Sequence, residues 1–256
     1  MAASAPPIGV QLYSLRNSLT DDFDGVIRKV ADIGYIGVEP YGGLPVPVEQ
    51  AAALFKELGL QVPSMHCPLP LGDDQRKVLD MAAAYNCRRI ISPWLAEERF
   101  ATLDEIRRSC DLFNEANRVA NDNGLSFGIH NHWQEFATID GRVVYEVMLD
   151  YLEPTVFFEV DVYWVKTAGP DPVAVIKRLG SRAPILHIKD GPTGRNIPMT
   201  AVGDGTLDIP AIIAAGADDA EWLIVELDDY AGVMMEAIDK SYHYLIGKGL
   251  ARGTKS

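Results

Sequence analysis

The sequence has few cysteines, few histidines and a shortage of positive charge. Its three cysteines, Cys67, Cys87 and Cys110, are odd in number and widely spaced, so they indicate neither a disulfide framework nor a Cys-x-x-Cys metal motif. Lys and Arg total 23 against 36 Asp and Glu, which gives a net charge of −13. A surface of that sign repels a phosphate backbone, so we expect no nucleic-acid partner.

Long apolar runs and targeting signals are also missing. No stretch of about 18 apolar residues exists, so we expect no membrane span. Residues 1–7 contain no basic stretch followed by an apolar core, which argues against a secretory signal. Together with the unpaired cysteines, this predicts a cytoplasmic protein. The hydrophobic content of 48% excludes a disordered chain.

What the sequence does contain is a regular alternation of two patterns. Eight apolar runs rich in β-branched residues predict strands, and their starts lie 26 to 39 residues apart. These runs cover residues 8–15, 35–41, 61–67, 88–94, 125–131, 156–164, 183–190 and 222–229. Between them, periodic apolar residues predict a first helix capped by Asp21 or Asp22 and ended by Gly34. Further helices are expected over residues 48–58, 103–123, 143–152, 172–179, 209–215 and 233–246.

This alternation predicts a single (β/α)8 TIM barrel domain over residues 1–256. Strand–helix repeats form parallel sheets, and eight strands close a barrel. The alternative is an open doubly wound sheet, which usually carries a glycine-rich phosphate turn after its first strand. Here the first run leads into Tyr13-Ser14-Leu15-Arg16 without such a turn. Residues 251–256 are expected to form a frayed tail.

Four of the five histidines fall at predicted strand ends, where the active site of such a barrel lies. Because strand side chains alternate between two faces, several polar residues are expected to share a face. The pairs are His130 with His132, Glu159 with Asp161, His187 with Lys189, and Glu226 with Asp228. If these faces point inward, the cluster suits Mn²⁺, Co²⁺, Zn²⁺ or Mg²⁺, which accept mixed imidazole and carboxylate ligands.

Ordinary structural roles compete with this interpretation. A lone histidine at a strand end, such as His66, is often a hydrogen-bonded packing residue. Glu39 could pair with an arginine at the barrel mouth. The aromatic pair Tyr163 and Trp164 would form a wall at a strand end, against either core or sugar.

Several motifs run along the chain in one order: IGVQLYSLR at 8–16, GIHNH at 128–132 with Glu135 and Phe136, EVD at 159–161 with Trp164, LHIKD at 186–190, GDG at 203–205 and VE at 225–226. Their combination resembles the sugar phosphate isomerase/epimerase group of xylose isomerase-like barrels. That group includes ketose epimerases, isomerases, inosose dehydratases and enzymes that eliminate or hydrate 3-keto-sugars.

The resemblance implies one divalent metal, with Mn²⁺ favoured over Mg²⁺, Co²⁺ or Zn²⁺. In many members the ligands are Glu, Asp, His and Glu on strands five to eight, which implies Asp161, His187 and Glu226 here. This chain has His130 where epimerase-like members have Glu on strand five. We expect His130 to be the fourth ligand, with Glu135 as the alternative. The departure points toward the keto-sugar lyase and dehydratase branches.

The resemblance also implies removal of a proton next to a carbonyl, while the metal stabilises the resulting charge. Isomerisation, epimerisation and elimination of a sugar or keto-sugar all remain open. His132, Glu135 and Glu159 are the candidate acid/base groups, and Lys189 is a candidate to polarise an oxygen. Glu39, His66 and Trp164 are expected to line the pocket. A non-catalytic sugar-binding barrel and a metal-dependent endonuclease are the alternatives, and a homo-oligomer is left open.

Overall fold

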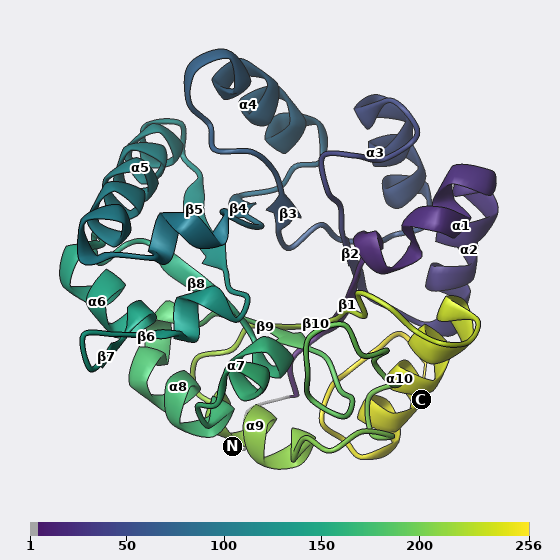
Figure 1. Ribbon diagram of the computed structural model, residues 1–256. Helices are drawn as coiled ribbons and strands as arrows, with labels where there is room; N and C mark the ends of the chain where they lie inside the picture. Colours follow the sequence, from purple (N-terminus) through teal and green to yellow (C-terminus); the bar gives the residue numbers. More distant parts are fainter. Residues whose placement is uncertain (1–4, 256) are drawn as a thin grey trace.

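The computed structural model describes residues 5–255, so the expectations for residues 1–4 and for Ser256 lie outside it. Eight parallel strands form a ring, and helices surround the ring (Figure 1). The strands are β1 (Ile8–Gln11), β2 (Gly37–Glu39), β3 (Met65–His66), β4 (Arg89–Ser92), β5 (Ser126–His130), β8 (Phe157–Asp161), β9 (Ile185–Ile188) and β10 (Trp222–Val225). The predicted (β/α)8 barrel is confirmed.

The ring closes between the segments of β2 and β3. The main-chain N–H of Val38 donates to the carbonyl of Gln61 at 2.9 Å, and that of His66 donates to Pro40 at 2.9 Å. All other neighbours pair in the order β2-β1-β10-β9-β8-β5-β4-β3. A short antiparallel hairpin, β6 (Thr138–Ile139) with β7 (Arg142–Val143), lies outside the barrel sheet.

Ten α-helices and five 3₁₀ helices are present in the described part of the chain. The α-helices are α1 (Arg16–Asp21), α2 (Phe23–Ile33), α3 (Val48–Glu57), α4 (Gln75–Ala84), α5 (Leu103–Asp122), α6 (Val144–Tyr151), α7 (Val162–Ala168), α8 (Pro172–Leu179), α9 (Ile209–Ala215) and α10 (Met234–Gly247). The 3₁₀ helices are η1 (Leu12–Leu15), η2 (Gly72–Asp74), η3 (Glu97–Phe100), η4 (Gln134–Phe136) and η5 (Gly180–Arg182). None of these helices is long and apolar enough to cross a membrane.

The helix α2 shows how the sequence sets these elements. Asp22 caps it by accepting a hydrogen bond from the N–H of Gly25 at 2.9 Å. Ile27, Val30 and Ile33 face the barrel and are buried. Gly34 ends the helix with a φ of 124°, a backbone conformation that favours glycine.

Three expectations need correction. The run 156–164 is not one strand, because β8 ends at Asp161 and α7 begins there: the Asp161 carboxylate accepts from the N–H of Trp164 at 3.0 Å. Tyr163 and Trp164 therefore lie on a helix.

The helix α4 was not expected, because only Val78 and Ala82 mark its buried face. Residues 251–255 are not frayed, since Arg252 pairs with the chain before β1 and Thr254 bonds to Gly34.

The inward faces of the strands form an apolar plug below the mouth. Phe157 of β8, Ile185 of β9, and Trp222 and Ile224 of β10 pack together with Ile91 of β4. Strand glycines make room for this plug: a Cβ on Gly128 would lie 2.3 Å from the Phe157 ring. Residues two positions further along these strands have the same direction. The plug therefore places Glu159, His187 and Glu226 inside the barrel, directly above it.

The buried Asp190, just after β9, organises the loop that follows. Its carboxylate accepts hydrogen bonds from the main-chain N–H groups of Gly191, Gly203, Gly205 and Leu207, at 2.8 to 3.2 Å. A Cβ on Gly205 would lie 2.0 Å from this carboxylate. The GDG motif thus serves the close approach of a loop to Asp190.

Candidate functional site

The carboxyl ends of six strands bring a charged cluster together inside the barrel. Its members are at most 5% exposed: Glu39 from β2, His66 from β3, His130 from β5, Glu159 and Asp161 from β8, His187 from β9, Lys189 just after β9, and Glu226 just after β10. Eight of the eleven site residues predicted from the sequence are in this cluster. The other three are His132, Glu135 and Trp164.

Glu159 lies among three histidines. Its Oε2 lies 2.6 Å from Nε2 of His66, 3.1 Å from Nδ1 of His130 and 3.1 Å from Nε2 of His187. Burial alone would raise the pKa of Glu159, but His187 and His66 hold it well below its usual range. Glu159 is therefore a carboxylate that accepts hydrogen bonds from the imidazoles around it.

Glu39 approaches the same Nε2 atoms of His187 and His66 as Glu159 does. Its Oε2 accepts from the Gln11 side-chain amide at 2.7 Å and lies 2.7 Å from Nε2 of His187. Burial and the nearby Glu159 raise the pKa of Glu39. Gln11 was not predicted as a site residue, because a glutamine in an apolar strand carries no chemical signature of its own.

Lys189 neutralises the opposite part of the cluster. Its Nζ lies 2.9 Å from Oδ2 of Asp161 and 2.8 Å from both Oε2 of Glu226 and Oδ2 of Asp228. Burial lowers the pKa of Lys189, but these three carboxylates hold it well above its usual range. Burial raises the pKa of Asp161 to about 6, against the effect of Lys189.

Asn131 fixes the end of β8 from the neighbouring strand. Its Oδ1 accepts the N–H of Asp161 at 2.9 Å, and its Nδ2 donates to the carbonyl of Asp161 at 3.2 Å. The asparagine of the His-Asn-His run thus positions the Asp161 main chain.

Two overlapping groups of four residues could hold a metal ion in the described chain. One is His130, Asp161, His187 and Glu226, and the other is His66, His130, Glu159 and His187. Within each group the ligand atoms lie within 4.8 Å of one another. The first group is the set expected from the sequence, and it excludes Glu135.

The first group also fits an ion in its local chemistry. Oδ2 of Asp161 is buried, contacts Nζ of Lys189 at 2.9 Å, and is faced by Nε2 of His130 at 3.7 Å. That distance is too long for a hydrogen bond but suits two ligands that each lie about 2.1 Å from one ion. Two imidazoles and two carboxylates form a donor set that suits Mn²⁺, Co²⁺ or Zn²⁺.

His132 and Glu135 lie beyond the end of β5. Glu135, in η4, is 1% exposed, and its Oε2 accepts the main-chain N–H of His132 at 2.8 Å. Burial raises the pKa of Glu135 to about 7. Burial, assisted by His130, lowers the pKa of His132, so this imidazole is neutral near pH 7.

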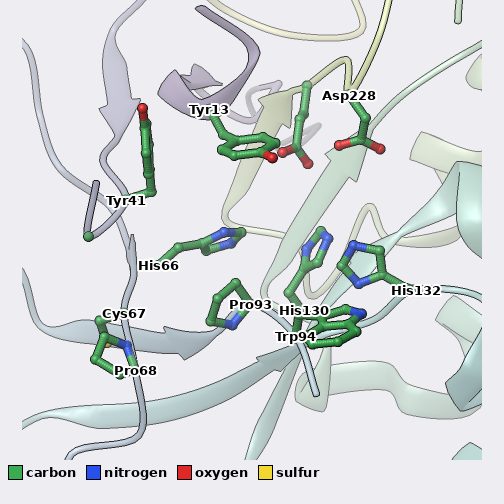
Figure 2. Close-up of a pocket in the computed structure, with 12 residues that line it drawn as sticks. Tyr13, Tyr41, His66, Cys67, Pro68, Pro93, Trp94, His130, His132 and Asp228 are labelled. Carbon is green, nitrogen blue, oxygen red and sulfur yellow. The ribbon is translucent and has the colours of Figure 1, made fainter. Parts of the chain in front are cut away.

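A cavity of about 430 Å³ opens onto the cluster (Figure 2). His66, His130, His132, Glu226 and Asp228 contribute polar atoms to its wall, and Tyr13, Tyr41, Pro68, Pro93 and Trp94 contribute apolar surface. Trp164 is 7% exposed and is not among the lining residues; its ring packs behind His132, with centroids 5.9 Å apart. The aromatic residues of this cavity were not predicted as site residues, because Tyr13 and Trp94 fall within apolar runs that were predicted to be strands.

A family model described as a xylose isomerase-like TIM barrel matches residues 27–244. The chain belongs to this family. A sugar phosphate isomerase/epimerase from Parabacteroides distasonis has 26% sequence identity and a TM-score of 0.81, over 96% of this chain and all of its own (100%). A second such protein from that organism has 24% identity and a TM-score of 0.82, over 99% of this chain and 97% of its own.

A solved structure of lower sequence identity contains zinc. The IOLI protein with a bound zinc atom has 16% identity and a TM-score of 0.75, over 98% of this chain and 100% of its own. At that identity the likeness shows the fold alone. A search of curated proteins finds no match to the chain.

The raised pKa of Glu135 predicts a pH-dependent stability effect. An unfolded glutamate ionises near its ordinary value of 4.5, whereas the folded one keeps its proton up to about pH 7. The carboxyl group therefore destabilises the fold as the pH rises through this window, by roughly 3 kcal/mol once both states are ionised. Relative to the wild type, Glu135→Gln should gain about that much between pH 4 and pH 8. Urea unfolding measures the difference, and a value that stays constant with pH would contradict the raised pKa.

Proposed function

We propose that this chain is a metal-dependent enzyme that removes a proton from the carbon next to the carbonyl of a sugar or keto-sugar. The observation that carries the proposal is the buried group His130, Asp161, His187 and Glu226, which opens onto a cavity. These four side chains would hold one divalent ion, most simply Mn²⁺. When bound, the ion would supply Lewis-acid stabilisation of charge that develops on the substrate oxygens.

Glu159 and Glu39 act on the histidines rather than on the substrate. Nδ1 of His130 donates to Glu159, which leaves its Nε2 directed toward Asp161. Nε2 of His187 donates to Glu39, which leaves its Nδ1 2.8 Å from Oε2 of Glu226. A carboxylate that fixes the tautomer of a ligand histidine is the usual outer partner of a metal site. Glu159, a candidate acid/base group from the sequence, is therefore assigned a positioning role.

His132 is the group that moves the substrate proton. It lines the cavity and is neutral near pH 7, so it can accept a proton. Glu135, which the sequence also offered as a base, does not line the cavity and holds the main chain of His132 instead. Lys189 is fully buried and contacts the carboxylates of Asp161, Glu226 and Asp228. Its role is therefore to hold these three groups in place.

Metal analysis of variants tests the ligand set. His130→Ala, Asp161→Ala, His187→Ala and Glu226→Ala should each lower Mn²⁺ affinity by more than about 100-fold, the upper end of what loss of an outer partner costs. Glu135→Gln is the matched control and should keep one ion per chain, measured by elemental analysis after equilibrium dialysis. If Glu135→Gln empties the site while His130→Ala leaves it filled, the two roles are reversed.

Proton exchange tests the reaction. The Mn²⁺-loaded protein in D₂O should incorporate deuterium next to the carbonyl of at least one member of a panel of free keto-sugars, detected by NMR. His132→Gln should keep its metal and lose about 10²–10⁴-fold in exchange rate, as expected when a base is removed. Glu135→Gln should retain most of the rate, because its amide oxygen still accepts from His132. A metal-loaded wild type that binds these sugars without exchange would instead be the sugar-binding barrel.

A further inference from the structure

The cavity above the cluster has two chemically different halves. The proposed metal ligands come from β5, β8, β9 and β10, on one side of the ring. The other side, at the ends of β1, β2, β3 and β4, contributes Tyr13, Tyr41, Pro68, Pro93 and Trp94, here called the aromatic half. Within residues 5–255, His66 alone carries a charged or imidazole group from that side into the cavity wall. A ligand in the mouth therefore meets the polar groups of the cluster and, beside them, the ring faces of the aromatic half.

The aromatic half exposes ring surface that the fold itself does not cover. Trp94 is 51% exposed and Tyr13 is 41% exposed, two of the few large hydrophobic residues on the surface of the described chain. Tyr13 packs edge-on against Tyr41, with centroids 5.4 Å apart. In Figure 2, this tyrosine pair and Trp94 lie on opposite sides of the histidines. Exposed aromatic faces around a polar site mark a place where a ligand packs.

No lysine or arginine side chain of the described residues lines the cavity to bind a phosphate group. Lys189 is fully buried beneath three carboxylates. The nearby Arg16 stacks on Tyr13 at 4.3 Å and donates to the carbonyls of Tyr13 and Asp228, at 2.9 and 2.8 Å. Glu226 and Asp228 face the cavity with negative charge, which repels a phosphate.

We propose that the substrate is an uncharged sugar derivative with a second ring. The reacting sugar lies against the metal ligands, an assignment that rests on the proposed function, and the second ring packs on Trp94. The volume of about 430 Å³ is within the range of sites that hold drug-sized ligands, about 300–1,000 Å³. The second ring is either another sugar or an aryl group, because both present an apolar face to an indole.

Calorimetric titration of the Mn²⁺-loaded protein tests the class of ligand. The probes are glucose, glucose 6-phosphate, cellobiose and phenyl β-D-glucoside. At least one of the two-ring probes should bind about tenfold more tightly than glucose, and the tighter of them identifies the second ring as sugar or aryl. Glucose 6-phosphate should bind no more tightly than glucose. Equal affinity of all four probes, or tighter binding of the phosphate, would overturn the proposal.

Variants of Trp94 locate the second ring. Trp94→Ala should weaken binding of the favoured two-ring probe about tenfold and leave glucose within about twofold, whereas Trp94→Phe should restore most of the affinity. Tyr151→Ala, which removes a 39% exposed aromatic ring outside the cavity, is the control and should change neither. If Trp94→Ala weakens both ligands equally, the ring does not pack there. Metal content is measured in the same samples: loss of metal binding defeats the proposed function, whereas a loaded protein without two-ring preference defeats this inference alone.

Discussion

Four carboxylates buried inside one barrel impose the constraint on which the rest of the structure depends. Glu39, Glu159, Asp161 and Glu226 are at most 3% exposed, and an unpaired buried charge is costly. Lys189 supplies one positive charge, and the imidazoles supply hydrogen bonds. A divalent ion between the imidazoles and Asp161 would supply the remaining compensation. Neighbouring side chains hold these groups at fixed distances: Gln11 donates to Glu39, and Asn131 bonds the main chain of Asp161.

The barrel meets this constraint with one repeated device. On β8, β9 and β10 the inward residue of the plug is apolar, and the residue two positions higher is polar, so that Phe157 and Ile224 pack below while the charges meet above. The cavity opens onto the cluster at the mouth, where its walls come largely from residues beyond the strand ends. The loops on one side carry His132 and Asp228, and those on the other carry Tyr13 and Trp94. Chemistry and ligand selection are thereby placed on different parts of the same rim.

Strand alternation was sufficient to predict the barrel and the convergence of His130, Asp161, His187 and Glu226, because both follow from local periodicity. Tertiary effects were not predictable in this way. The β-forming sequence after Asp161 becomes the helix α7 because that carboxylate caps it, and residues 251–255 are ordered by pairing with a distant segment. Gln11 and the aromatic half were missed because a glutamine or an exposed tryptophan has no distinctive spacing. The assignment of Glu159 to the histidines required distances, since parity alone placed it with Asp161.

We propose that the buried carboxylates of this barrel are arranged for one divalent ion. Anomalous diffraction of crystals grown with MnCl₂, recorded at an X-ray energy just above the manganese absorption edge, tests this proposal. We expect a single strong peak per chain, bounded by His130, Asp161, His187 and Glu226, with Lys189 still in contact with Asp228. An absent peak, or a peak bounded by His66 and Glu159 instead, would contradict it.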